Sequence, residues 1–147
     1  MCAVDPQRRV LMPRAWRLDG DTAATTFYIM PAPGNVVRVC STEYFNEQMD
    51  LMSRLNPSEP VNQEAMLIVG SLTQAVVPDR QGRFSLSQEI LDYGQLGKRV
   101  AFVGMVSFGR IVSEELWNEC GKNQGALLAL EQNIYKERQK NWQPRGS

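Results

Sequence analysis

The chain contains the same short pattern twice, and this duplication constrains the fold more than any other feature of the sequence. The two copies are residues 5–12 (DPQRRVLM) and 79–86 (DRQGRFSL). In each copy an aspartate is followed four positions later by an arginine and then by an apolar run, with an offset of 74 (79 − 5 and 83 − 9). An apolar strand expected at 72–77 precedes the second copy, and Pro78 and Gly82 punctuate its loop. The pattern predicts a polar loop between two short strands.

A second pair of segments repeats in the same order. Residues 38–47 (RVCSTEYFNE) match residues 110–119 (RIVSEELWNE) with an offset of 72 (110 − 38). The two offsets differ by two residues, which indicates a small insertion or deletion near residues 32–35. We therefore interpret the chain as a tandem duplication, with halves at 1–57 and 58–120 and a C-terminal helix or tail at 121–147.

These repeated residues resemble the MraZ family of bacterial transcriptional regulators, which has two AbrB-like halves with an Asp-x-x-x-Arg motif in each. The second half matches best, in residues 79–83, 91–96, 100–104 and Trp117, and the resemblance covers roughly residues 3 to 120. It implies an α+β fold of two tandem swapped-hairpin β units with short helices, packed as a pseudo-symmetric pair. It also implies a closed ring of subunits that binds promoter repeats upstream of the division and cell-wall gene cluster.

The first copy departs from the family pattern in two places. Arg8 stands where the family has glycine, and a residue with a Cβ costs about 1 kcal/mol if the backbone there has positive φ. The family also has a strand ahead of its first motif, whereas only residues 1–4 precede Asp5. We expect a first half that is frayed, trimmed or completed by a neighbour.

The motif arginines have two possible roles. In an isolated motif the favoured role would be structural, with Asp79 accepting from Arg83 to hold the turn. Two copies, each leading into a strand, favour arginines at hairpin lips that contact a phosphate or bond bidentately to guanine. The resemblance implies that role for Arg9 and Arg83, with the loops positioned by Asp5, Asp79 and Gly82. The remaining basic residues are predicted to contact phosphates without reading sequence: Arg8, Arg14 and Arg80.

Serine caps and apolar spacing predict the other elements. Hairpins are expected at 25–30 with 36–40, and at 99–105 with 108–112. Helices should follow four serines, the one after Ser58 stopping at Gly70 and the one after Ser41 ending near residue 56. The other two caps are Ser87 and Ser113. A tail helix could carry Leu127, Leu130 and Ile134, and we expect Phe45, Trp117 and Cys40 to be packing residues.

Composition limits the possible functions. The 16 Lys and Arg balance the 16 Asp and Glu, so the protein is not uniformly basic. The charges are segregated, however, with +3 (4 − 1) over residues 1–17 and −4 (1 − 5) over residues 41–64. Each repeat is small enough to be marginal alone, which favours mutual packing or a homo-oligomer.

Several classes of protein are disfavoured. The chain has no histidine, and its three cysteines lack metal-site spacing, so neither an enzyme, a metal site nor a cofactor is expected. No leader or membrane-length apolar run is present, which predicts a cytoplasmic, nucleoid-associated protein without membrane or small-molecule substrate. The expected partners are double-stranded DNA and further copies of the chain. Two alternatives stay open, an oligomeric interaction module that has lost DNA binding and the AbrB-like antidote of a toxin–antidote pair.

Overall fold

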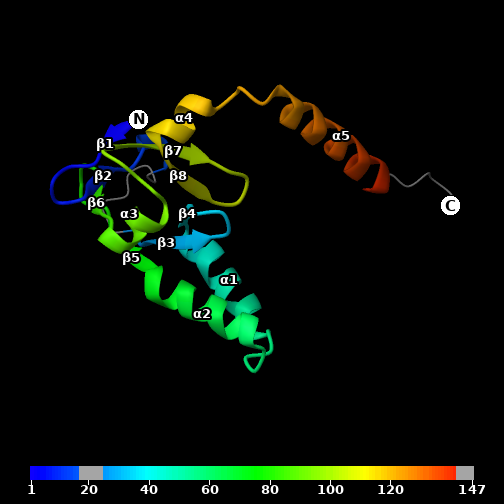
Figure 1. The fold of residues 1–147 in the computed structure, drawn as a ribbon, viewed down its shortest axis with the longest axis horizontal. Coiled ribbons are helices and arrows are strands. Elements are labelled where there is room, and N and C mark those ends of the chain that lie inside the picture. The colour runs from blue at the N-terminus through cyan, green and yellow to red at the C-terminus, as the bar shows by residue number, and fades with distance from the viewer. Residues whose placement is uncertain (17–24, 142–147) are drawn as a thin grey trace. The chain divides into compact units, whose positions relative to one another are not determined.

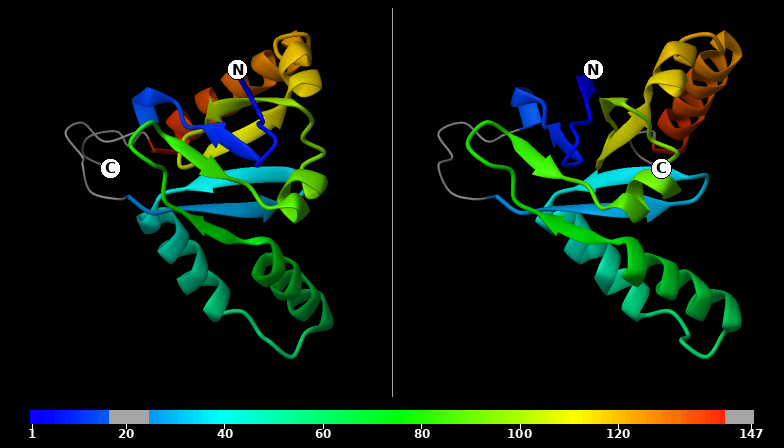
Figure 2. Two further views of the ribbon diagram at one scale, coloured as in Figure 1. Left: turned by 90° about the vertical axis from the view of Figure 1, so that its left-hand side faces the viewer. Right: turned by 60° about the vertical axis from the view of Figure 1, so that its left-hand side comes forward.

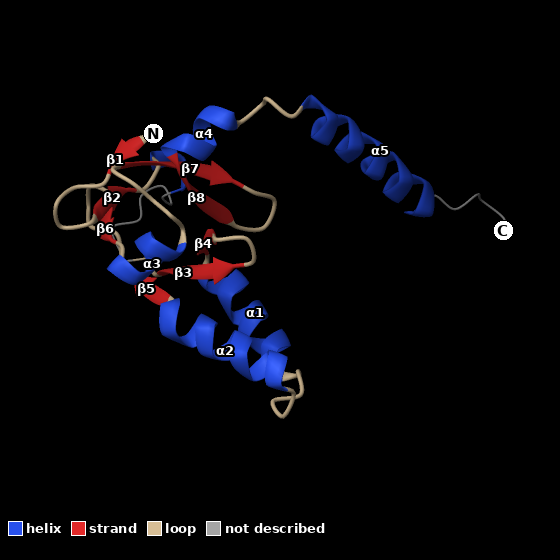
Figure 3. Cartoon of the chain, in the orientation of Figure 1, coloured by secondary structure: helices blue, strands red, loops and turns tan. Residues whose placement is uncertain are grey.

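The computed structural model describes residues 1–16 and 25–141, and the chain divides into two units, Met1–Trp117 and Asn118–Ser147 (Figure 1). The fold is mixed α+β, as predicted (Figure 3). The strands are β1 (Cys2–Ala3), β2 (Arg9–Leu11), β3 (Phe27–Ala32), β4 (Val36–Cys40), β5 (Gln74–Val76), β6 (Arg83–Ser85), β7 (Arg99–Gly104) and β8 (Gly109–Ser113). The helices are the 3-10 turn Arg14–Trp16, α1 (Thr42–Ser53), α2 (Pro60–Leu72), α3 (Gln88–Tyr93), α4 (Glu114–Glu119) and α5 (Gln124–Asn141).

The larger sheet exchanges strands between the two repeats. Its order is β1-β7-β8-β4-β3-β5, and every pairing is antiparallel. The leading strand of each repeat joins the hairpin of the other, because β1 pairs with β7 while β5 pairs with β3. The two hairpins meet at the centre, where β4 pairs with β8. The arrangement confirms a pseudo-symmetric pair of swapped units.

The expectation that the first motif lacks a leading strand is wrong. Cys2 and Ala3 form β1 opposite Val100 and Arg99, and the Val4 amide donates to the Lys98 carbonyl at 2.8 Å. The first half is therefore completed by the second-half hairpin of the same chain.

The two motif strands pair with each other to form a two-stranded ribbon, β2–β6. Val10 lies opposite Phe84 at its centre, and both side chains are buried, at 1% and 5% exposure. The ribbon packs over one face of the large sheet, where the core also includes Val37 and Ile111. The strands on either side of the second loop were expected to pair as a hairpin, and this expectation is wrong because β6 pairs with β2 and β5 with β3.

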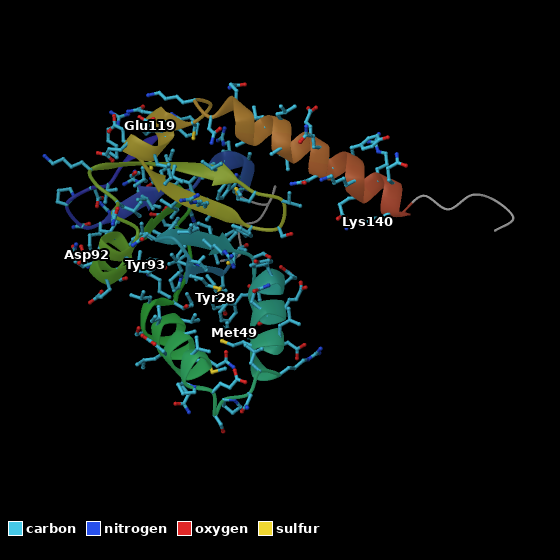
Figure 4. The ribbon with its side chains drawn as sticks, turned by 45° about the vertical axis from the view of Figure 1, so that its right-hand side comes forward. Tyr28, Met49, Asp92, Tyr93, Glu119 and Lys140 are labelled. Atoms are coloured by element: carbon cyan, nitrogen blue, oxygen red, sulfur yellow. The ribbon has the colours of Figure 1, made fainter. Side chains whose placement is uncertain are left out.

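Helices α1 and α2 cover the opposite face of the sheet at β3 and β4, and Figure 2 shows these strands between that helix pair and the ribbon. Tyr28, labelled in Figure 4, alternates with core residues along β3 and stacks on Phe45 of α1 with ring centroids 3.8 Å apart. On the core side, the Tyr93 hydroxyl of α3 donates to the Ala32 carbonyl, and the Asn35 amide donates to the Tyr93 carbonyl at 2.9 Å. These contacts fix the β3–β4 turn.

Three of the four predicted serine caps are present. The hydroxyl oxygens of Ser41, Ser87 and Ser113 accept from amides three residues later at 3.1 Å. The second helix instead begins after Glu59, with Pro60 in its first turn, so the predicted Ser58 cap is wrong. Pro60 has a fixed φ that suits the start of a helix.

Other differences concern element ends and burial. Helix α2 continues through Gly70 because that glycine keeps a helical backbone and only costs helix propensity. Trp117 is 43% exposed rather than core, since α4 has six residues and buries none. Phe45 is half-buried, and Cys40 is fully buried as predicted. The sequence Asp19-Gly20-Asp21 also predicts a loop, which lies outside the described residues.

The second unit contains the predicted tail helix, α5. Leu127, Leu130 and Ile134 each expose about half of their surface within this unit. Among the described residues, no helix combines the length and apolar character needed to span a membrane.

Candidate nucleic-acid interface

The second loop, residues 79–83, is organised by one carboxylate. Asp79 Oδ1 accepts from the backbone amides of Gln81 and Arg83, each at 2.9 Å. The Asp79 amide donates to the Arg83 carbonyl, and the Gly82 amide donates to the Asp79 carbonyl, both at 2.9 Å. Gly82 has φ 88°, which a glycine adopts without steric cost.

The first loop, residues 5–9, repeats this network. Asp5 Oδ1 accepts from the amides of Gln7 at 2.9 Å and Arg9 at 2.7 Å. The two backbone bonds recur at 3.1 Å (Asp5 amide to Arg9 carbonyl) and 2.8 Å (Arg8 amide to Asp5 carbonyl). Arg8 takes the left-handed conformation with φ 61°. Arg8 therefore has the positive φ that is unfavourable for a residue with a Cβ, and the loop still forms the same backbone hydrogen bonds as the second loop.

Both aspartates stay ionised at neutral pH. The backbone amide of Arg9 lowers the pKa of Asp5, and the backbone amide of Arg83 lowers the pKa of Asp79. Hydrogen bonds to a carboxylate favour its charged form, so each loop is held by an anion rather than by a neutral acid.

The ribbon connects the two loops. The Met12 amide donates to the Gly82 carbonyl at 2.8 Å, and the Leu86 amide donates to the Arg8 carbonyl at 2.9 Å. Antiparallel pairing places one loop at each end of the ribbon, with Arg9 opposite Ser85 and therefore diagonal to Arg83. Since side chains alternate along a strand and Val10 faces the core, both arginines lie on the outer side, with Cα atoms about 7–8 Å apart.

The arginines of the two loops have different partners. Arg9 Nε donates to Asp5 Oδ2 at 2.7 Å in an ion pair whose side chains are 39% and 31% exposed. Arg83 is exposed and forms no ion pair with any residue that the structure describes. The structural role considered for the motif thus applies to the guanidinium of Arg9. Among the described residues, Asp79 bonds to the main chain of Arg83 and not to its guanidinium.

The three predicted phosphate contacts lie in different settings. Arg8 is exposed, but its Nε donates to the Leu86 carbonyl at 3.0 Å, which fixes the side chain across the ribbon. Arg80, in the second loop, and Arg14, in the 3-10 turn after β2, are exposed. Sequence reasoning missed the Leu86 carbonyl and the shared outer side of the ribbon. The 74-residue offset between the motifs could have predicted the shared side, because two copies related by an approximate two-fold axis place their equivalent strands side by side.

Comparison with known proteins finds similar sequences among bacterial transcriptional regulators. No family model matches the chain. It is similar to the transcriptional regulator MraZ of Dictyoglomus turgidum, with 21% identity over 130 residues, 88% of this chain and 87% of that protein. The protein of the same name from Mycoplasmopsis pulmonis is 25% identical over 117 residues (80% and 74% of the two chains), and that from Oleidesulfovibrio alaskensis is 28% identical over 120 residues (77% and 76%). These relatives confirm the resemblance that the two motifs indicated, and the chain is similar to MraZ transcriptional regulators over most of its length.

Proposed function

We propose that this protein regulates transcription by binding DNA with the outer side of the β2–β6 ribbon. One observation carries the proposal, namely that Arg9 and Arg83 lie on the same solvent-facing side of one ribbon, each at the end of a hydrogen-bonded loop. A two-stranded ribbon fits the major groove of B-form DNA. The buried side chains of Val10 and Phe84 anchor the ribbon to the core. Because the ribbon is already ordered, DNA binding carries little entropic cost for ordering its backbone.

Each loop residue has a role in this proposal. Arg83 bonds bidentately to guanine O6 and N7, and Arg9 does the same once its guanidinium leaves Asp5. The aspartates and Gly82 hold the loops and do not contact DNA themselves. The flanking arginines fix the register on the phosphate backbone: Arg8, Arg14 and Arg80.

The regulator acts as a homo-oligomer, which we propose to be a closed ring. One neutral subunit offers few DNA contacts, so several subunits on tandem promoter repeats are needed for useful affinity. Exposed apolar side chains support self-association, among them Val61 and Leu67 of α2 at 69% and 73% exposure. We propose that the protein lies in the cytoplasm at the nucleoid and that its target is the promoter of the division and cell-wall gene cluster. In this proposal it is a regulator and not an enzyme. We also propose that the repeats are residues 1–57 and 58–120, followed by a tail at 121–147.

Fluorescence anisotropy tests this function. Purified protein is titrated into labelled duplexes that carry tandem promoter repeats or a scrambled sequence, across a salt series. We expect tighter binding to the repeats, with an affinity that falls as salt rises because phosphate contacts release counterions. Equal affinity for both duplexes at every salt concentration would contradict sequence-specific binding.

A second candidate, an oligomeric interaction module without DNA binding, is favoured by the ion pair that occupies Arg9. This candidate predicts no band shift on promoter DNA at moderate salt, together with a stable oligomer in light scattering. A monomer at micromolar concentration would contradict both candidates.

A further inference from the structure

Two arginines face each other at the centre of the large sheet, away from the ribbon. Arg38 of β4 lies directly opposite Arg110 of β8, where the hairpins of the two repeats meet. Their neighbours Val37, Val39 and Ile111 are buried in the core. Because side chains alternate along strands, this arginine pair projects from the other face of the sheet.

Nothing in the described part of the chain neutralises this arginine pair. Like charges directly opposite each other on antiparallel strands are destabilising. No carboxylate of the described residues forms an ion pair with Arg38 or Arg110. The Nε atoms of both are also buried without a hydrogen-bond partner among the described residues. Buried N–H donors are nearly always paired in folded proteins, so two unpaired ones at one position call for acceptors beyond the described residues, such as an ordered water or an anion.

Aromatic residues hold one of the two guanidinium groups in place. Arg38 lies 4.6 Å from the centroid of the Phe108 ring, and its Nη1 lies 3.4 Å from the Tyr44 hydroxyl. The rings of Tyr44 and Phe108 are 5.6 Å apart, so together they form a wall beside the charge. In the repeat, the positions equivalent to Phe108 and Tyr44 are Val36 (108 − 72) and Leu116 (44 + 72), which offer Arg110 no ring or hydroxyl. Arg38 is thus preorganised, whereas no aromatic side chain of the described residues holds the guanidinium of Arg110.

We propose that Arg38 and Arg110 form a binding site for a phosphate dianion, as inorganic phosphate or as the terminal phosphate of a small molecule. Two guanidinium groups carry two positive charges, which a phosphate monoester at neutral pH matches with about −1.5 to −2. A single carboxylate carries half of that charge, and a DNA phosphodiester likewise carries one. The planar guanidinium fork bonds phosphate oxygens bidentately.

The bound anion joins the two repeats. It bridges β4 to β8, the pairing that unites the two hairpins, on the side of the sheet away from the ribbon. The site is therefore separate from the proposed DNA surface, and a ligand that binds only the folded chain raises its unfolding temperature.

Thermal unfolding and calorimetry of the full chain test the site, with sodium phosphate compared to sodium chloride at equal ionic strength. We expect phosphate to raise the melting temperature of the parent in a saturable way and to bind with one site per chain. Arg110→Gln should weaken phosphate binding by on the order of tenfold or more, as for the loss of a charge-assisted bidentate contact. Adenosine monophosphate in place of phosphate shows whether a phosphate ester also fits.

Two further variants make the outcome decisive. Arg83→Ala should bind phosphate like the parent, and Arg110→Gln should bind DNA like the parent in chloride buffer, so this site and the DNA surface fail independently. If Arg110→Gln does not fold, Arg110→Lys keeps the charge without the fork and should still bind phosphate more weakly. Equal phosphate effects in the parent and the Arg110 variant would overturn the proposal. Loss of phosphate binding in Arg83→Ala would also overturn it. A third contradicting result is a parent that binds no phosphate while Arg110→Gln changes the mass of the oligomer, because the arginine pair would then bind a carboxylate of a second copy.

Discussion

The two Asp-x-x-x-Arg loops have the same backbone but different side-chain contacts. In both, an aspartate accepts from the amides two and four residues later, and a residue with positive φ precedes the arginine. The guanidinium of Arg9 is bound by Asp5, whereas that of Arg83 is free of ion pairs among the described residues. The carboxylate and the backbone are therefore sufficient to form the loop. Whether the arginine guanidinium forms an ion pair with the motif aspartate differs between the two copies.

The largest expected effect comes from removing the ribbon that both loops share. Phe84→Ala should lower the free energy of unfolding by roughly 3–5 kcal/mol, because a buried aromatic at the ribbon centre leaves a cavity. Trp117→Ala is the aromatic control and should cost less, since its side chain is 43% exposed. Chemical denaturation of both variants measures the difference. Equal losses would show that the ribbon centre is not a special part of the core.

The next effect separates the loops by DNA affinity. Arg83→Ala should weaken binding to the repeat duplex by about 1–3 kcal/mol per engaged subunit, as for loss of a bidentate base contact. Arg9→Ala should cost less, because Arg9 must first leave its ion pair with Asp5. Fluorescence anisotropy gives both values, with Arg138→Ala on α5 as the control. If Arg9→Ala were the more damaging change, the ion-paired arginine would be the principal reader.

A smaller effect should distinguish the positive-φ positions. Gly82→Ala places a Cβ at φ 88° and should destabilise the fold by about 1–2 kcal/mol. Gly97→Ala is a matched control, since no atom lies within 4 Å of its added Cβ and its φ is not positive. Thermal melts compare the two. A neutral Gly82→Ala would mean that the second loop tolerates a side chain as readily as the first loop tolerates Arg8.

The smallest effect should be shared by the two loops. The pKa values of Asp5 and Asp79 lie below the usual 3.8 because backbone amides bind both carboxylates. A carboxyl group with a lowered folded-state pKa stabilises the fold above the unfolded pKa, and this contribution is lost as pH falls through the folded value. Asp5→Asn and Asp79→Asn should therefore each flatten the fall of stability below pH 4. NMR titration of the carboxyl carbons checks the direction, and a midpoint above 3.8 at either aspartate would contradict it.

The sequence by itself determined the local features of this protein. The repeated motifs predicted both loops, and the serines before apolar runs predicted the caps at Ser41, Ser87 and Ser113. The α+β class and the resemblance to MraZ regulators followed from the same residues. These features depend on hydrogen bonds between residues a few positions apart, so the residue types and their spacing are sufficient to specify them.

Only the tertiary structure decided which distant segments meet. Pairing of β1 with β7 and of β5 with β3 exchanges strands between repeats, and identical local patterns are compatible with exchange or with separate halves. Burial was also undetermined, since Trp117 and Phe45 occupy equivalent positions, and among the described residues only Phe45 of the two stacks on an aromatic ring. The same holds for Arg9 and Arg83, because the geometry of a guanidinium depends on neighbours that the strand pairing brings together rather than on the motif that contains it.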